Sequence, residues 1–160
     1  MGVKGLANEI KPVVKRTKIK DYIGKTLAVD ASLLIYQVVI GIRTGGYDLK
    51  NSHGEITTHI VGLLHKIRSI MHWGIELIFV FDGKPPKFKG NELDKRRIKK
   101  REAKKKLYQL KKSGTDKEAQ TRYFKRSFSI NEKIVVDCKR LLDLLGIRYI
   151  QAIGEADAIL

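Results

Sequence analysis

Residues 75–81 form a nearly continuous apolar run that ends on Asp82 and then turns through a glycine and two prolines. The run is rich in aromatic and β-branched residues and is too short for a buried helix, so it predicts a strand. It does not alternate with polar residues as a half-exposed strand would, which favours a parallel sheet covered on both faces. Residues 26–30 repeat this pattern and end on Asp30. The sequence therefore predicts an α/β domain whose strands close on carboxylates.

Helical periodicity accounts for most of the remaining chain. Apolar spacing and capping patterns predict a third strand over residues 147–150 and helices over residues 32–42, 57–73, 92–112, 115–126 and 129–145. Two of these helices open on a capping-box pattern, Ser or Thr followed three residues later by Glu, at Thr115 and at Ser129. Residues 43–56 are predicted to be a loop, and Gly154 begins another helical pattern. This order predicts a mostly parallel central sheet with helices on both faces and an inserted helical hairpin.

The inserted hairpin carries most of the positive charge of the chain. Residues 84–126 contain 18 Lys and Arg against 5 Asp and Glu, a net charge of +13, and the whole chain carries +16. The charges surround the helix over residues 92–112, whose few apolar residues form no wide stripe: Leu93, Ile98, Leu107 and Leu110. Disorder is the alternative to a projecting hairpin. Because clustered positive charge attracts phosphate backbones, we expect a nucleic-acid partner; a solvated basic face on an unrelated protein is the alternative.

The sequence disfavours several other classes of protein. No apolar run approaches the roughly 20 residues that a membrane span needs, so no membrane partner is expected. Cys138 is the only cysteine, which excludes an intrachain disulfide and favours an intracellular protein. We expect its helix to bury Ile134, Cys138, Leu141, Leu142 and Leu145. The four histidines lack zinc-type spacing and are expected to be packing or surface residues.

Four acidic residues fall at or just beyond the ends of the predicted strands. Asp30 and Asp82 close the first two strands, and Glu155 and Asp157 follow the third. Because the carboxyl ends of parallel strands meet at one edge, we expect these acids to converge there. Carboxylate oxygens suit Mg²⁺ or Mn²⁺, and two such ions can promote phosphodiester hydrolysis. Each acid also has a structural alternative: Asp30 as a helix cap, Asp82 as a turn residue and Glu155 as a first-turn acid.

A series of ordered motifs carries a family resemblance: Met1-Gly2-Val3-Lys4-Gly5-Leu6, Val29-Asp30-Ala31-Ser32, Ile35-Tyr36-Gln37, Arg43 with Gly45-Gly46, Gly54-Glu55-Ile56-Thr57, Val80-Phe81-Asp82-Gly83-Lys84-Pro85-Pro86 and Gly154-Glu155-Ala156-Asp157-Ala158. Through them the whole chain resembles the N-terminal part of the flap endonuclease family of structure-specific 5′ nucleases. A sister group, the exonuclease-1 type, commonly has the Glu-Ala-Asp-Ala form found here, where flap endonucleases usually have Glu-Ala-Glu-Ala. The Gly-Lys-Pro-Pro turn and residues 54–57 favour the flap endonuclease branch.

The resemblance implies a role for each matching residue. Two Mg²⁺ ions, with Mn²⁺ as a substitute, would be bound or positioned by Asp30, Asp82, Glu155 and Asp157. Lys89 and Arg96 match basic residues that contact the scissile phosphate, where cations neutralise transition-state charge. The remaining expected DNA contacts are Gly2, Tyr36, Arg43, Lys50, Thr57, Lys125 and Arg126.

The same resemblance implies an activity. A PIN-like 5′ nuclease would hydrolyse DNA near 5′ flaps and single-strand/duplex junctions by two-metal-ion catalysis, in replication and repair. Residues 84–128 would form a helical arch, and residues 1–160 would be the N-terminal part of a nuclease domain whose remainder is absent. This part alone would be inactive or impaired, a sliding clamp would bind an absent C-terminal region, and a eukaryotic member would be nuclear. The alternatives are a 5′–3′ exonuclease of the exonuclease-1 type, a noncatalytic DNA-binding module for this segment alone, and a basic surface for an acidic protein.

Overall fold

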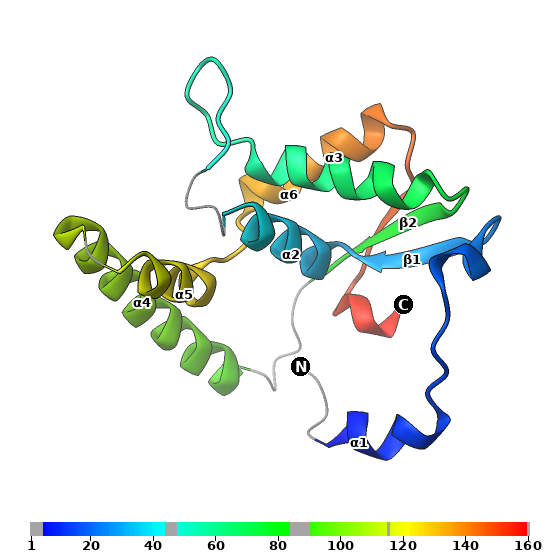
Figure 1. The fold of residues 1–160 in the computed structure, drawn as a ribbon, viewed down its shortest axis with the longest axis horizontal. Helices are drawn as coiled ribbons and strands as arrows, with labels where there is room; N and C mark the ends of the chain where they lie inside the picture. Colours follow the sequence, from blue (N-terminus) through cyan, green and yellow to red (C-terminus); the bar gives the residue numbers. More distant parts are fainter. Residues whose placement is uncertain (1–4, 44–47, 84–89, 115, 160) are drawn as a thin grey trace.

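The computed structural model describes residues 5–43, 48–83, 90–114 and 116–159, and its centre is a parallel sheet (Figure 1). The sheet has the strand order β1-β2-β3, with β1 at Thr26–Asp30, β2 at Glu76–Phe81 and β3 at Tyr149–Gln151. Its register runs from Thr26↔Glu76 to Asp30↔Val80 and from Phe79↔Tyr149 to Phe81↔Gln151. The predicted parallel α/β architecture is therefore confirmed, and the carboxyl ends of all three strands lie at one edge.

Three amphipathic helices cover one face of this sheet and enclose the main core. They are α2 at Ala31–Arg43, α3 at Thr58–Met71 and α6 at Glu132–Leu144, which Figure 1 shows gathered on the same side of the strands. The buried core joins alternate residues of β2 to these helices: Leu77, Phe79 and Phe81 with Ala31, Leu34, Ile35, Val39, Leu63, Ile67, Cys138 and Leu142. None of the helices in the described residues is both long and apolar enough to cross a membrane. We call the sheet and these three helices the body.

The opposite face of β2 explains why its apolar run does not alternate. Val80 is 1% exposed on that face and packs with Ala152 and Ala156 in a small second cluster. The segment that covers it includes the short 3₁₀ helix η4 at Ala156–Ala158, which is what the structure has in place of a longer helix beginning at Gly154. Both faces of β2 are thus in use, as the uninterrupted apolar run predicts.

The basic insertion forms the predicted helical hairpin, which we call the arm. It consists of α4 at Gly90–Ser113 and α5 at Lys117–Ser127, which pack side by side (Figure 1). A narrow seam of Ala103, Leu107 and Ala119 is buried between them, while Ile98 stays 56% exposed. Because alanine side chains are small, the two charged helices can pack closely although neither has a wide apolar stripe. This packing supports two helices in a segment as polar as the arm.

Two helix starts differ from the capping boxes expected at Thr115 and Ser129. Helix α5 is capped by Asp116, whose side chain accepts a hydrogen bond from the Ala119 N–H at 2.8 Å. Helix α6 is capped by Asn131, which accepts from the Ile134 N–H at 2.9 Å. Asp and Asn rank with Ser as the most favoured N-cap residues, because their side-chain oxygen can accept a hydrogen bond from an N–H of the first turn. The N-cap of α6 is therefore Asn131 and not Ser129. Thr115 lies outside the described residues.

The amino-terminal segment contains short helices that the periodicity of the sequence does not predict. They are α1 at Leu6–Ile10, η1 at Lys11–Val13 and η2 at Ile19–Tyr22. The first two bury none of their described side chains, so they carry no apolar stripe that periodicity could reveal. In Figure 1, α1 lies apart from the helices that cover the sheet, whereas Tyr22 of η2 packs against the main core.

Cys138 is a packing residue, as its place on the apolar stripe predicts. Its side chain is fully buried, and burial together with the nearby Asp137 charge raises the pKa of the thiol to about 12. The thiol is therefore protonated at neutral pH and is a weak nucleophile. The stripe itself is narrower than expected, because Leu145 is 41% exposed beyond the end of α6.

Candidate functional site

Asp30 and Asp82 lie at the carboxyl ends of neighbouring strands. Asp30 is the last residue of β1 and pairs in register with Val80, and Asp82 directly follows β2. The Asp30 Oδ1 accepts a hydrogen bond from the Leu33 N–H at 2.8 Å, which caps the start of α2. The Asp82 Oδ1 accepts from the Ala156 N–H at 3.0 Å. Asp30 therefore has the capping role considered for it, whereas the Asp82 side chain contacts a segment 74 residues away instead of its own turn. Among the described residues, these hydrogen bonds use one carboxylate oxygen of each acid.

The turn after β2 is fastened to the segment after β3. The Gly83 N–H donates to the Gly154 carbonyl at 2.6 Å, and the Gln151 Nε2 donates to the Asp82 carbonyl at 2.7 Å. An added Cβ on Gly83 would collide with backbone, since it would lie 2.6 Å from the Ile153 oxygen and closer still to the Ala152 oxygen. These contacts hold the backbone of Asp82 beside the chain that carries Glu155.

The chemistry of these acids fits a divalent cation, and the described residues supply part of such a site. All four predicted ligands offer only carboxylate oxygens, the donors that Mg²⁺ and Mn²⁺ prefer. Glu155 precedes η4 and is half-buried, and Asp157 is exposed within it. No three His, Cys, Asp or Glu side chains of the described residues lie close enough together to hold a metal ion. The expected four-acid cluster is thus not assembled in the described chain, and the ligand set stays a prediction.

Tyr36, expected to stack on a base, connects α2 to the arm. Its hydroxyl donates to the Lys125 carbonyl at 2.7 Å, and its ring lies 5.8 Å from that of Phe128, centroid to centroid. Phe128 in turn lies 5.6 Å from Phe124. Tyr36 therefore fixes where the C-terminal end of α5 meets the body.

Arg43, expected to contact DNA, makes the second link between body and arm. Its Nη2 lies 2.7 Å from the Asp48 Oδ2, and its guanidinium carbon lies 3.8 Å above the centre of the Phe124 ring. Burial lowers the pKa of Arg43, and the nearby Asp48 charge opposes that change. Phe124 and Phe128 were not among the predicted functional residues, although an aromatic pair at the end of an otherwise basic segment could have indicated them.

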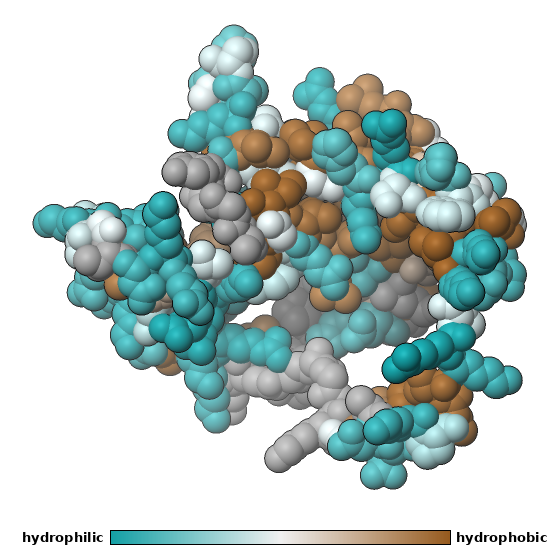
Figure 2. All heavy atoms as spheres, viewed as in Figure 1, coloured by the Kyte–Doolittle hydropathy of each residue, from teal (hydrophilic) through white to brown (hydrophobic). Residues whose placement is uncertain are grey.

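The other expected DNA contacts fall on the arm and on the loop before α3. Arg96 and Arg126 line one hollow between α4 and α5, of about 860 Å³, together with the ring of Tyr123. Lys125 is exposed on α5, and Figure 2 shows hydrophilic side chains covering the arm. Lys50 forms an isolated bridge with Ile56, and Thr57 precedes α3. Gly2 and Lys89 lie outside the described residues.

His59 is a buried partner of an acid. It is 4% exposed on α3, and its Nε2 lies 3.0 Å from the Asp137 Oδ2 of α6. The packing role expected for the histidines applies to it, but its partner was not foreseen. Asp137 is 78 residues away and lies beside the apolar stripe of its helix, so local spacing gives no signal for the pair.

Comparisons with known proteins agree with this fold. The XPG N-terminal domain family matches residues 1–103. Flap endonuclease 1 of Homo sapiens is 40% identical over 162 residues, covering 99% of this chain and 42% of the relative, and that of Danio rerio is 39% identical with the same coverage. The structure of flap endonuclease-1 from Methanococcus jannaschii matches with a TM-score of 0.56 and 30% identity, over 90% of this chain and 46% of that one.

A structure titled as the catalytic core of Rad2 in complex with DNA substrate matches with a TM-score of 0.58 and 24% identity. It covers 98% of this chain and 40% of that one, and this likeness bears on the fold alone. The chain spans 42% of the length of the flap endonuclease relatives from Homo sapiens and Danio rerio.

Proposed function

Because this chain belongs to the XPG N-terminal domain family and resembles the flap endonucleases throughout, we propose that it is the N-terminal part of a structure-specific 5′ nuclease. The enzyme hydrolyses DNA phosphodiesters near junctions between single strand and duplex, in replication and repair. One observation supports this most directly: Asp82, at the end of a buried strand, is held to the segment carrying Glu155 at the root of a polycationic arm. A nuclear location in a eukaryote, and contact with a sliding clamp outside residues 1–160, belong to the same proposal.

Each group of residues has a separate task in this reaction. Asp30, Asp82, Glu155 and Asp157 would hold Mg²⁺ ions, two in the full site, with Mn²⁺ as a substitute. When bound, such ions supply positive charge at the attacking and leaving oxygens. The hydrogen bonds at Asp82 and Gly83 hold the backbone of Asp82 against the segment that carries Glu155, which limits the reorganisation that these two acids need when a phosphate arrives. Arg96 and Lys89 would neutralise the charge that grows on the phosphate.

The arm would bind and orient the DNA strand. Its cations surround α4 and the end of α5, so they can contact phosphates without reading bases. Tyr36 and Arg43 fix the arm against α2, whose first residue follows Asp30. A strand held on the arm is therefore held at a set distance from the carboxylates.

Cleavage of defined DNA substrates tests the proposed function. We expect the complete polypeptide to cut a 5′-flap duplex in Mg²⁺, to cut it much more slowly in EDTA, and to leave an intact blunt duplex largely uncut. Equal cutting of flap and blunt duplex would contradict the structure preference, and progressive shortening from a 5′ end would favour the exonuclease-1 type. Binding without any metal-dependent cutting would favour a noncatalytic DNA-binding module, an alternative suggested by the lack of a three-acid cluster in the described residues.

Arg96→Ala is expected to slow single-turnover cleavage by about 10²-fold while weakening flap binding by about threefold or less. The reason is that a cation aimed at the reacting phosphate acts mainly in the transition state, whereas one of many arm cations contributes little to affinity alone. Lys112→Ala, at the far end of the same helix, is the matched control and should change neither quantity appreciably. A loss of affinity equal to the loss of rate would make Arg96 an ordinary phosphate contact.

A further inference from the structure

The backbone carbonyl of Asp82 is held by a side chain from the neighbouring strand. The Gln151 Nε2 donates a hydrogen bond to this carbonyl at 2.7 Å, and Gln151 is the last residue of β3, in register with Phe81. Asp82 lies one residue beyond the end of β2, where the strand pairing has stopped, so the Gln151 amide supplies a partner that the sheet does not. The side chain therefore extends the hold of β3 on β2 as far as the acid.

Lys139 of α6 determines which way this amide faces. Its Nζ donates a hydrogen bond to the Gln151 Oε1 at 2.7 Å. An amide has one accepting oxygen and one donating nitrogen, so an ammonium at the oxygen directs the nitrogen to the Asp82 carbonyl. Hydrogen bonds in such a chain polarise one another, and the bond from the lysine strengthens the bond to the carbonyl. Lys139, Gln151 and the Asp82 carbonyl thus form one connected chain, which we call the amide relay.

Packing holds Lys139 in place within the relay. Its Nζ lies 5.0 Å from the centre of the Phe81 ring and 5.5 Å from that of Tyr149, and these rings meet edge to face with their centroids 5.7 Å apart. The side chain is half-buried, and among the described residues it forms no ion pair with an acid. Within the same part of the chain, Gln151 is its hydrogen-bond acceptor. The ammonium is therefore directed at the amide and is not drawn away by a carboxylate.

The segment after β3 fixes Asp82 through three hydrogen bonds. The Asp82 Oδ1 accepts from the Ala156 N–H at 3.0 Å, and its carbonyl accepts from Gln151. The next N–H along the chain, that of Gly83, donates to the Gly154 carbonyl at 2.6 Å. Within the residues that the structure describes, the other carboxylate oxygen, Oδ2, accepts no hydrogen bond. A carboxylate that is held in this way has little conformational freedom to lose when it binds a cation.

We propose that Gln151 is a positioning residue for metal binding at Asp82, and that Lys139 orients it. This inference rests on the proposed function, because it takes Asp82 as a ligand of the divalent cation. In this role Gln151 acts through the backbone of Asp82 and not as a ligand. The relay raises the affinity for the cation by reducing the freedom that Asp82 loses on binding, and it requires no contact between DNA and either Gln151 or Lys139.

Binding of Mn²⁺ to the complete polypeptide, followed by the electron paramagnetic resonance signal of the free ion, tests the relay. Gln151→Met keeps the length of the side chain and removes both hydrogen bonds, so it should weaken Mn²⁺ binding by about tenfold, the lower end of the usual effect for a residue that holds a metal ligand. Lys139→Met should weaken it by about threefold, because the amide can still donate without the lysine. Lys139→Arg keeps a positive donor and should restore binding to within about twofold of the unaltered protein.

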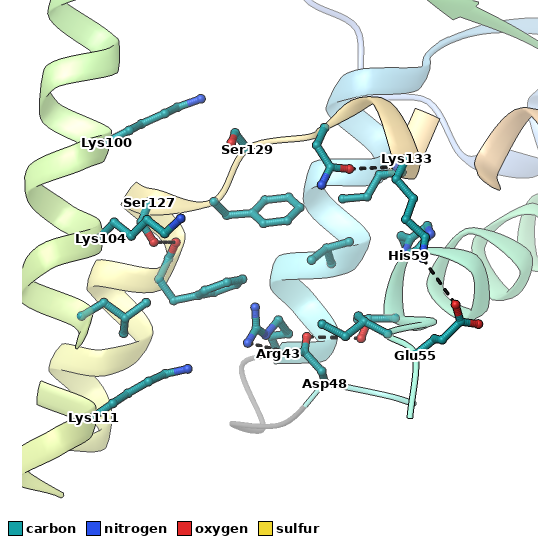
Figure 3. Close-up of a pocket in the computed structure, with 18 of the residues that line it drawn as sticks. Arg43, Asp48, Glu55, His59, Lys100, Lys104, Lys111, Ser127, Ser129 and Lys133 are labelled. Atoms are coloured by element: carbon teal, nitrogen blue, oxygen red, sulfur yellow. Dashed lines mark hydrogen bonds and ion pairs between the residues drawn. The ribbon is translucent and has the colours of Figure 1, made fainter. Parts of the chain in front are cut away.

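Lys133→Met is the matched control on the same helix. Lys133 lies 3.6 Å from Glu55 beside a second hollow, between arm and body, that none of the four strand-end acids lines (Figure 3). The substitution removes one lysine charge from α6 without touching the relay. We expect its Mn²⁺ affinity to match that of the unaltered protein.

Two further measurements separate positioning from a merely structural role. In the metal-free protein, hydrogen exchange at the Gly83 amide should be at least about threefold faster in Gln151→Met, because the turn opens more readily. In single-turnover cleavage, Gln151→Met should need about tenfold more Mg²⁺ to reach half of its maximal rate, while its flap affinity in EDTA stays within about twofold. A merely structural role would lower the thermal midpoint and leave the Mg²⁺ requirement of the folded protein unchanged.

The outcomes distinguish this inference from the proposed function. If Asp82→Asn loses Mn²⁺ affinity and Gln151→Met does not, the positioning role is wrong and the metal assignment of Asp82 stands. If Asp82→Asn binds Mn²⁺ as tightly as the unaltered protein, the metal assignment fails and the positioning role fails with it. Equal losses in Lys133→Met and Lys139→Met would also overturn the inference, because they would show a general effect of charge on α6.

Discussion

Asp82→Asn in the complete polypeptide should lower the single-turnover rate of flap cleavage by about 10³-fold and leave flap affinity within about threefold. The change removes a negative charge but keeps an oxygen that can accept the hydrogen bond from the Ala156 N–H, now 3.0 Å from Oδ1. Transition-state stabilisation by a bound divalent cation is worth several kcal/mol, and each 1.36 kcal/mol changes a rate tenfold. DNA affinity depends on the arm cations, which this substitution does not touch.

Asp143→Asn is the matched control for this prediction. Asp143 is exposed near the end of α6, in the chain that leads into β3, so it lies at the edge of the sheet away from the strand carboxyl ends. We expect its cleavage rate and affinity to match those of the unaltered protein. If the Asp82→Asn variant cleaves at the wild-type rate in Mg²⁺, Asp82 is not a metal ligand. If its flap affinity falls as much as its cleavage rate, Asp82 acts through contact with DNA.

The strands and their terminal acids could be predicted because their signals are local. A buried strand between two covered faces must be apolar throughout, and a carboxylate at its end interrupts that run, so Asp30 and Asp82 stand out from sequence alone. The convergence of the strand ends then follows from the parallel topology. The positions of Glu155 and Asp157 could not be predicted from the sequence. The helix expected there is only a 3₁₀ turn, and long-range contacts with Asp82 and Gly83 determine where it lies.

The join between arm and body shows the opposite case. The charge of the arm was enough to predict that it binds phosphate groups. No local sequence pattern, however, predicts the contact between Arg43 and Phe124, or the hydrogen bond from Tyr36 to the Lys125 carbonyl 89 residues away. Such pairs form because the fold closes a long loop, and they use residue types that are unremarkable where they stand. The family resemblance predicts that Tyr36 and Arg43 contact DNA. In the structure each also holds the arm against the body, so a mutation at either position would remove that contact as well.

Gly83 is the residue whose substitution should disturb the protein most widely. Its N–H donates to the Gly154 carbonyl at 2.6 Å, and the space that a Cβ would need is occupied by the backbone of Ala152 and Ile153. Real Cβ atoms do not approach other heavy atoms below 3.0 Å, so the two segments must separate if a methyl group is added. The cause is lack of space and not backbone strain, since Gly83 does not have a positive φ.

Gly83→Ala is therefore expected to lower the free energy of unfolding by about 3 kcal/mol, the upper part of the usual range for overpacking, and the thermal midpoint by roughly 6–12 °C. It should also reduce cleavage below the level that the remaining folded fraction would give, because separation of the two segments moves Asp82 away from Glu155. Gly41→Ala provides the matched control: the same methyl group enters open space within α2, and the better helix propensity should stabilise the protein by about 0.5–1 kcal/mol. Chemical denaturation and single-turnover cleavage, measured on both variants well below their thermal midpoints, separate the two effects. A Gly83→Ala protein as stable and as active as the Gly41→Ala control would mean that the turn after β2 is not the rigid support of the site.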